Sequence, residues 1–225
     1  MNKLSSHTLH LRATPNLDVG QLMAMPPNLH VGSSPRDFWV WVNPCNWLVK
    51  HQVKVVGCFI SAGSVGRGDS NLPFIPNPKF TGDISPFSVG VTHHYAAEYN
   101  FEVNREHYFP EYPSRLNAIY LLRSEAEALE YGERHISHVG GRLLKRVQSV
   151  GNYAYSTHDS SWVDFLRLNH SCDDQTIQSV TQAYWRGENV ANHQLLSMGA
   201  PWTESPIIEA LFLGRIDFYD RTFPG

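Results

Sequence analysis

Glu209 stands in an unusual setting for a charged side chain, inside the apolar run of residues 207–213. Carboxylates are rarely buried unless they are paired or catalytic. The pattern leaves two interpretations open. Glu209 is either a buried functional carboxylate or a carboxylate that faces water from an exposed strand.

Ser114, Arg115 and His10 also have side chains that could contact a ligand. Ser114 and Arg115 precede an apolar segment, and an arginine at a strand start can place a planar, permanent cation at the edge of a cleft. Such a cation suits a pyrophosphate or a carboxylate, although a surface ion pair is the commoner role. His10 alternates with leucines in a short extended segment, where a lone histidine is more often structural.

A metal site is a further interpretation, based on His93, His94, Glu98 and Glu102. The last three are spaced four residues apart and so share one face of a helix. A metal ion would need ligands from a second cluster, to which His7 could contribute. The alternative is a solvated helix face, and we expect no bound metal.

Several well-known motifs are absent from the sequence. It contains no glycine-rich dinucleotide or P-loop fingerprint, no HExxH and no GxSxG. The Arg-Gly-Asp-Ser tetrapeptide at 67–70 is short enough to arise by chance in a glycine-rich stretch. Classical nucleotide folds, zinc proteases and α/β hydrolases are therefore disfavoured.

Both strands and helices are needed to position these residues. Apolar helical spacing and capping residues predict helices at 94–108, 124–138, 159–168 and 173–186. The helix starts are indicated by Ser124 with Glu127, by Asp159 and by Asp173 or Asp174. Alternating or β-branched runs predict strands at 8–12, 38–42, 53–60, 115–122, 142–150 and 207–219. The order lacks a clean βαβ alternation, which favours an α+β fold.

Length and composition point to a single globular domain over residues 1–225. The chain is 42% apolar, and a loop-rich insertion is expected around 61–92, where glycine and proline recur. The net charge of −3 disfavours non-specific binding to duplex nucleic acid. Three cysteines without CxxC spacing make a disulfide framework improbable. No leader and no membrane-spanning run is evident, so we expect a cytoplasmic protein without membrane contact.

Four of these segments, in order, resemble ADP-ribosyltransferases of the His-Tyr-Glu, diphtheria-toxin-like class. The opening at residues 9–20 is similar to the histidine strand of the rifamycin-modifying branch. Residues 118–128 and 141–147 resemble that class's tyrosine strand, alanine-rich helix and following strand. Residues 209–214 resemble the late strand that carries its acidic residue, as in DarT-like toxins. The resemblance implies split β-sheets with flanking helices and a central NAD cleft.

The resemblance also implies roles for individual residues. His10 would hydrogen-bond a ribose hydroxyl of NAD, Tyr120 would stack on the nicotinamide, and Glu209 would stabilise positive charge at the ribose. Arg12 and Arg115 would bind the pyrophosphate of NAD, and Ser114 would also belong to the cofactor site. The loops at 61–92 and 151–160 would shape acceptor recognition, and residues 184–188 would either line the acceptor side or belong to the core.

Residues 101–105 and 109–115 resemble uncharacterised bacterial and phage proteins that we associate with the same superfamily. This favours a toxin of phage–bacterium conflict that modifies a macromolecule. The acceptor would be a protein or a nucleic acid, in particular a single strand, and an antitoxin partner would be expected. Two alternatives remain: a non-catalytic binding protein on the same fold, and the metal-dependent enzyme described above.

Overall fold

The computed structural model describes residues 26–65, 86–168, 172–197, 199–203 and 205–223. Side chains are described over these ranges except for residues 65, 86–94 and 138. The described part is a mixed protein of helices and antiparallel strands, which confirms the expected α+β class. The predicted strand at 8–12, with His10 and Arg12, lies outside the described residues.

Within the described residues, six strands form one sheet in the order β1-β5-β2-β4-β8-β3. An additional pairing of β5 with β8 joins the sheet back on itself, so that β5, β2, β4 and β8 form a closed ring. All the pairings are antiparallel. The strands are β1 (Leu29–Gly32), β2 (Asp37–Val42), β3 (Cys58–Ile60), β4 (Ile119–Leu122), β5 (Leu143–Asp159) and β8 (Ile208–Phe218). A separate short hairpin pairs β6 (Leu196–Ser197) with β7 (Ala200–Pro201).

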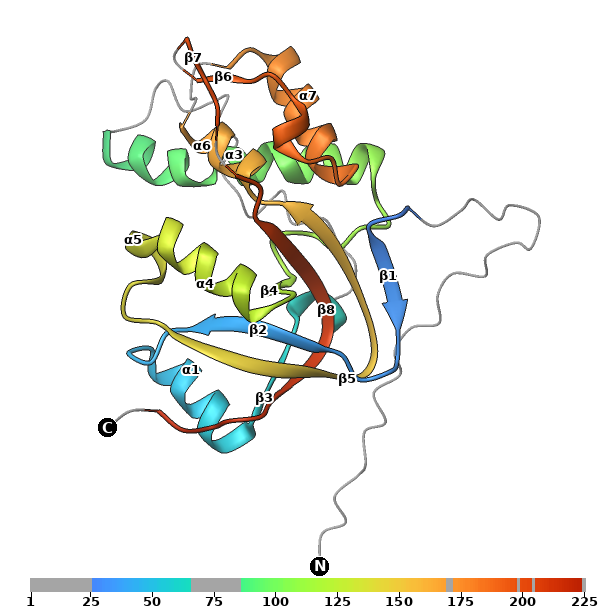
Figure 1. Cartoon of the computed structure of the whole chain (residues 1–225), viewed down its shortest axis with the longest axis vertical. Coiled ribbons are helices and arrows are strands. Elements are labelled where there is room, and N and C mark those ends of the chain that lie inside the picture. The colour runs from blue at the N-terminus through green and yellow to red at the C-terminus, as the bar shows by residue number, and fades with distance from the viewer. Residues whose placement is uncertain (1–25, 66–85, 169–171, 198, 204, 224–225) are drawn as a thin grey trace, which may run out of the picture.

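The helices cover the sheet in three groups, which Figure 1 shows at the top, the left and the bottom of the view. The top group is α3 (Pro86–Tyr108), α6 (Ser161–Leu168) and α7 (Asp174–Trp185). The left group is α4 (Glu125–Arg134) and α5 (Ile136–Val139), and the bottom group is α1 (Trp47–His51) with the π-helical turn η1 (Gln52–Val56). The short segments α2 (Ala62–Val65) and η4 (Val190–Asn192) complete the described elements.

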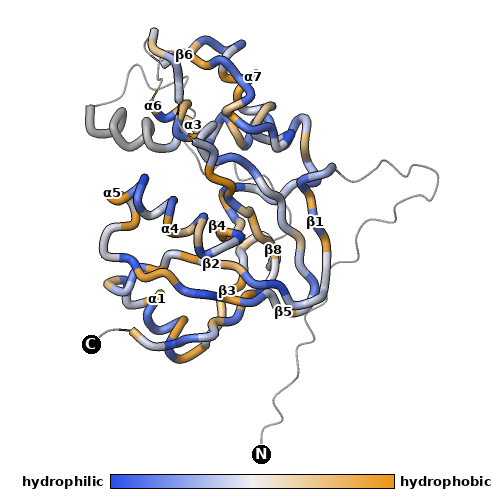
Figure 2. The backbone as a smooth tube through the Cα atoms, in the orientation of Figure 1, coloured by the Kyte–Doolittle hydropathy of each residue, from blue (hydrophilic) through white to orange (hydrophobic). Residues whose placement is uncertain are grey.

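The two faces of the closed ring pack against two different cores. One core joins Leu211 of β8 to aromatic residues of α3, α6 and α7, including Phe101, Trp162 and Trp185. The other lies inside the ring and contains Phe212. Leu211 and Phe212 point to opposite faces because side chains alternate along a strand, and Figure 2 shows this part of β8 as hydrophobic. Glu209 shares its face with Leu211 and therefore points toward the helices of the top group.

β5 is much longer than expected and corrects the prediction of a loop at 151–160. The strand continues through these residues, because its second half pairs with β8 from Ala154↔Leu213 to Asp159↔Ile208. A register shift between Val150 and Ala154, with Gly151 at φ 70°, lets the strand bend and resume pairing. The long strand carries residues from the lower core up to the helices.

Three other element predictions are corrected in part. Residues 53–60 were expected to be extended, but the first of them continue the helix that Asn46 caps, until Gly57 ends it at φ 80°. The insertion at 61–92 contains α2 and the start of α3, where Pro86 occupies the first helical position. The strand predicted at 115–122 begins only at Ile119, because the amides of Asn117 and Ala118 turn back to the carbonyl of Ser114.

The remaining elements follow the sequence pattern closely. Ser124 and Asp173 are N-caps: the side chain of each accepts a hydrogen bond from the backbone N–H three residues later, that of Glu127 and Thr176 respectively. The predicted helix 124–138 breaks at His135 into α4 and α5. No helix in the described part of the chain is long and apolar enough to cross a bilayer.

Candidate functional site

Arg115 lies at the centre of a buried ionic network. Its guanidinium donates two hydrogen bonds to Glu98, from Nε to Oε2 at 2.8 Å and from Nη2 to Oε1 at 3.1 Å. The third nitrogen, Nη1, donates to Oε1 of Glu209 and, at 2.6 Å, to the hydroxyl of Tyr184. Tyr184 in turn donates to the same Glu209 oxygen at 2.7 Å. One arginine thus holds two carboxylates and one phenol together.

Four elements that are distant in sequence supply this network. Glu98 comes from α3, Arg115 from the turn before β4, Tyr184 from α7 and Glu209 from β8. The turn, rather than the expected strand start, directs Arg115 toward the helices: the Ser114 hydroxyl accepts the amide N–H of Leu116 at 3.1 Å. The pairing of the two strands β4 and β8 then fixes Glu209 beside this turn.

The charges of this network stabilise one another. Burial alone would lower the pKa of Arg115, but the carboxylates of Glu209 and Glu98 raise it well above its ordinary value. Burial likewise opposes ionisation of Glu98, yet Arg115 and Arg167 more than offset it, so the pKa of Glu98 lies below its ordinary value. Burial raises the pKa of Tyr184, which therefore keeps its proton. The network is ionised, and each of its buried charges is stabilised only while its partners are present.

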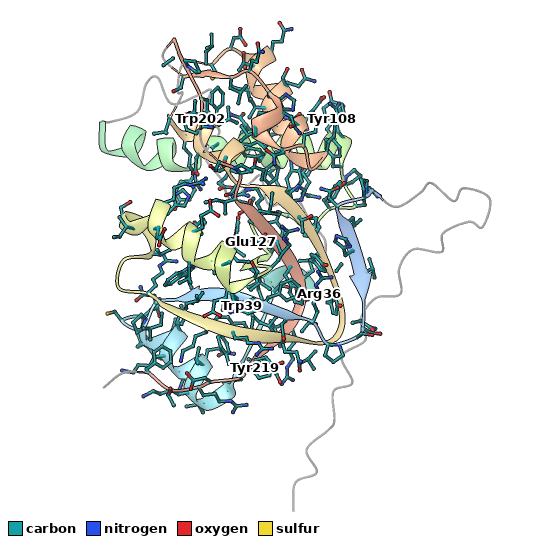
Figure 3. All side chains as sticks on the ribbon, viewed as in Figure 1. Arg36, Trp39, Tyr108, Glu127, Trp202 and Tyr219 are labelled. Carbon is teal, nitrogen blue, oxygen red and sulfur yellow. The ribbon has the colours of Figure 1, made fainter. Side chains whose placement is uncertain are left out.

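A cavity of about 460 Å³ opens beside the network, between the sheet and the helices α3, α4, α5 and α6. Glu98, Arg115 and Glu209 line it. Its walls are rich in aromatic side chains: Trp39, Trp41, Tyr95, Tyr120 and Tyr131. Figure 3 labels Trp39 on β2, at the sheet side of this space. The volume is in the range of small-molecule sites, and aromatic walls suit a flat ring.

Tyr120 combines a fixed position with an accessible ring. Its hydroxyl donates to the carbonyl of Arg115 at 2.5 Å, and the Arg115 guanidinium lies 5.1 Å from the ring centre. The residue is nevertheless 42% exposed. Burial raises the pKa of the Tyr120 phenol, which favours its neutral form. Tyr120 can therefore present an aromatic surface to a ligand without losing its hydrogen bond.

Three more charged residues line the cavity: Arg142, Asp164 and Arg167. Arg167 donates to Glu98 at 2.9 Å, and its side chain is 46% exposed. Burial raises the pKa of Asp164, whose carboxylate lies 3.4 Å from Nε2 of His135. Arginines and a carboxylate thus join the aromatic walls, which is the combination that binds a ligand with both a ring and charged groups.

The structure brings three of the expected site residues together and separates one. Tyr120, Arg115 and Glu209 all line the cavity. Ser114 is buried beneath it, where its hydroxyl donates to Glu102 at 2.8 Å, so it does not contact a ligand in this arrangement. Arg115 is 5% exposed and already binds two carboxylates, so it is a counter-ion rather than the free anion-binding group that we expected. His10 and Arg12 lie outside the described residues.

The acceptor-side and metal interpretations receive no support from these contacts. Tyr184 and Trp185 are fully buried core residues, whereas Arg186 and Gly187 of the same segment are exposed. Glu98 and Glu102 are each bound to an arginine, Glu102 to Arg105 at 2.8 Å. Among the described side chains, which do not include His93 and His94, no group of three His, Cys, Asp or Glu could hold a metal ion.

His158 is a functional-looking residue that the sequence did not single out. It is the β5 partner of Glu209 across the sheet, and it is 1% exposed. Its Nδ1 lies 2.8 Å from the carbonyl of Tyr184, and its Nε2 lies 2.7 Å from the hydroxyl of Ser156. Burial lowers the pKa of His158 to about 3, although the Tyr184 carbonyl opposes the shift. This neutral imidazole supports Tyr184 from behind the cavity.

Other residues that the sequence analysis missed are Asp164, Arg167 and the structural role of Glu98. The three-residue spacing of Asp164 and Arg167 on a predicted helix indicated a shared face. Nothing in that spacing indicated that the face would meet α3 and β8. Tyr184 was considered for the acceptor side or the core, but not as a hydrogen-bond partner of Glu209.

The chain belongs to the family described as "Protein of unknown function (DUF2441)", whose sequence profile matches residues 82–199. The match includes most of the cavity's charged residues, among them Glu98, Arg115 and Arg167, and it ends before Glu209. A search of curated proteins found no match.

Proposed function

We propose that this protein is an NAD-dependent ADP-ribosyltransferase of the His-Tyr-Glu class, with the split-sheet fold of that class. The observation that carries the proposal is the meeting of Tyr120 and Glu209 at one cavity of about 460 Å³. Both residues stand in the segments that resemble the motifs of that class. Their convergence from separate strands is what an active site of this kind requires.

The chemistry needs a carboxylate and an aromatic ring in this arrangement. Cleavage of the bond between nicotinamide and ribose leaves positive charge on the ribose carbon, and nicotinamide departs with the bonding electron pair. An ionised carboxylate stabilises such an oxocarbenium-like centre. Arg115 and Tyr184 both bind Oε1 of Glu209, and within the described residues Oε2 makes no hydrogen bond. Oε2 is therefore the oxygen available to the ribose.

Tyr120 and the aromatic walls would hold the nicotinamide. A ring 42% exposed, with its hydroxyl anchored, loses little conformational entropy when it stacks on a ligand. The acceptor would be a macromolecule, a protein or a single-stranded nucleic acid, and the setting a toxin of phage–bacterium conflict. Such a toxin would act in the cytoplasm and be neutralised by an antitoxin.

The decisive experiment is nicotinamide release from NAD, measured by mass spectrometry with and without cell lysate. We expect release by the wild type to rise with lysate and to fall at least about 100-fold in Glu209→Gln, since loss of one such electrostatic group costs roughly 3 kcal/mol in the barrier. Glu130→Gln, an exposed glutamate of α4, is the matched control and should retain full activity. Equal release by Glu209→Gln and the wild type would refute the assignment.

A non-catalytic binding protein on the same fold is the second candidate. It is favoured by the pairing of Glu209 with Arg115 and Tyr184, which gives this carboxylate a structural role. Thermal unfolding with NAD separates the two functions. Ligand at about 100 times its Kd stabilises a protein by roughly 2.7 kcal/mol. Stabilisation without nicotinamide release in any lysate would identify a binding protein.

A further inference from the structure

Arg142 lines the cavity, and the described part of the chain supplies no counter-ion for it. Its residue is half-buried, at the turn that leads from α5 into β5. Each of the other two arginines in the cavity wall binds a carboxylate: Arg115 binds Glu98 and Glu209, and Arg167 binds Glu98. Within the ranges that the structure describes, the Arg142 guanidinium makes no ion pair and no hydrogen bond.

The position of Arg142 is fixed by its backbone. Its amide donates to the carbonyl of Val139 at 2.8 Å, which closes the turn after α5. Gly141 forms this turn at φ 77°, a conformation that side chains with a Cβ rarely adopt. The turn therefore places the Arg142 charge beside the cavity without help from an acidic partner in the described ranges.

Arg167 supplies a second cation, and only part of its guanidinium group is paired with a carboxylate. Its Nη2 binds Glu98 at 2.9 Å, while its Nη1 is 3.9 Å from Asp164. The side chain is 46% exposed, against 4% for Arg115. Arg167 can thus turn donors toward a ligand, whereas Arg115 cannot do so without abandoning a buried carboxylate.

We propose that Arg142 and Arg167 form the phosphate subsite of this cavity, and that the subsite binds the pyrophosphate of a nucleotide. Guanidinium groups present paired donors that match phosphate oxygens. The aromatic walls are suited to the rings of such a ligand. A free phosphate has no ring and would not need these walls. The identity of the nucleotide as NAD rests on the proposed function, but the subsite itself does not.

The test is calorimetric titration of the intact protein with ADP-ribose, with inorganic pyrophosphate and with adenosine. We expect ADP-ribose to bind the wild type, and its Kd to rise about tenfold or more in both Arg142→Gln and Arg167→Gln. Adenosine lacks a phosphate, so its affinity should not respond to either substitution. Arg215→Gln removes a similarly exposed arginine that binds only Asp217 of its own strand, and it should bind ADP-ribose like the wild type.

Each outcome has a definite meaning. Among the described residues Arg142 has no side-chain partner to lose, so the Arg142→Gln protein should melt like the wild type, and Arg142→Lys should recover part of the affinity. Unchanged ADP-ribose affinity in Arg142→Gln, or no binding of ADP-ribose or pyrophosphate to the wild type at millimolar concentration, would overturn the subsite. Arginine-dependent ADP-ribose binding without nicotinamide release would uphold the subsite and reject the transferase. Nicotinamide release that needs Glu209 but not Arg142 would uphold the transferase and reject the subsite.

Discussion

The neighbours of Glu209 determine how this carboxylate is interpreted. The sequence allowed either a buried functional carboxylate or one that faces water, and the residue is 7% exposed. Its charge is tolerated there because Arg115 and Tyr184 contact it directly. The buried charge of Arg115 is likewise tolerated because two carboxylates contact it. At the scale of single residues, the site is a set of charges that cannot be removed one at a time without cost.

Substitution of Arg115 by methionine tests this dependence. The variant keeps most of the side-chain volume but leaves Glu98 and Glu209 without their shared buried counter-ion. Breaking a buried pair in this way costs about 3–5 kcal/mol of unfolding free energy. Urea denaturation at pH 7 measures the loss.

The control for this substitution is Arg123→Met. Arg123 forms a pair four residues along the chain with Glu127, and its side chain is 39% exposed. Exposed helical pairs contribute well under about 1 kcal/mol. Equal losses in Arg115→Met and Arg123→Met would show that the buried network is not the stabilising unit we describe.

Asp159 connects several elements around the site. It ends β5, and its Oδ1 accepts the amide N–H of Ser161 at 3.0 Å, which starts α6. The same oxygen accepts the N–H of Ile207 at 3.1 Å, just before β8. Oδ2 accepts the N–H of Val190 at 2.9 Å, at the start of η4. One carboxylate thus fixes the junction of the strand that carries Glu209 and the helix that carries Asp164.

We expect Asp159→Ala to cost about 3 kcal/mol or more, because three backbone donors in a buried setting lose their acceptor. Ser124→Ala is the matched control, since Ser124 caps α4 by accepting the N–H of Glu127 alone. A lost N-cap of that kind costs about 1 kcal/mol. Denaturation curves of both variants measure the two losses, and a cost for Asp159→Ala no greater than that for Ser124→Ala would contradict this role.

Elements defined by local signals were predictable from the sequence. Ser124 and Asp173 mark helix starts because a cap needs only its own next residues. The prediction was wrong where distant partners decide. Residues 53–56 include three β-branched valines but continue the helix capped at Asn46, and residues 151–159 remain extended because β8 lies beside them.

The site shows the same division. Tyr120 and Glu209 were found through motifs, and they do meet at one cavity. Spacing could not show that Glu98 and Glu209 converge on Arg115, so the anion-binding role expected of Arg115 did not include these two partners. Arg142 was missed for the same reason: an arginine at a turn is unremarkable until its neighbours prove to be a cavity wall.

At the scale of the whole molecule, the cavity and a buried neutral histidine, His158, both lie at the boundary between the sheet and the top group of helices. His158 lies against Tyr184 with ring centres 4.4 Å apart and parallel to within 21°. Its Nδ1–H donates to a carbonyl, because a carbonyl can only accept, so its Nε2 accepts from Ser156. The uncharged ring satisfies both hydrogen bonds, and burial opposes the charge that a second proton would bring.

This boundary makes global stability depend on pH. The pKa of His158 is about 3 in the folded protein, because of burial, and 6.5 is its ordinary value. Between these values the unfolded chain binds a proton that the folded protein excludes, so the stability from His158 is complete above about pH 6.5 and declines as the pH falls toward 3. Each pH unit in that window costs about 1.4 kcal/mol, or roughly 2 kcal/mol between pH 6.5 and pH 5.

Unfolding free energies of the wild type and of His158→Gln, measured in urea from pH 7.5 to pH 5, test this dependence. Glutamine cannot take up a proton, so the variant should be less stable at pH 7.5 but should lose about 2 kcal/mol less than the wild type on reaching pH 5. His107→Gln, which changes an exposed histidine of α3, should follow the wild-type slope. Parallel curves for His158→Gln and the wild type would mean that His158 takes up a proton in the folded protein. The sheet–helix boundary would then accommodate a second buried positive charge near Arg115, against the burial and the Arg115 charge that lower the pKa of this ring.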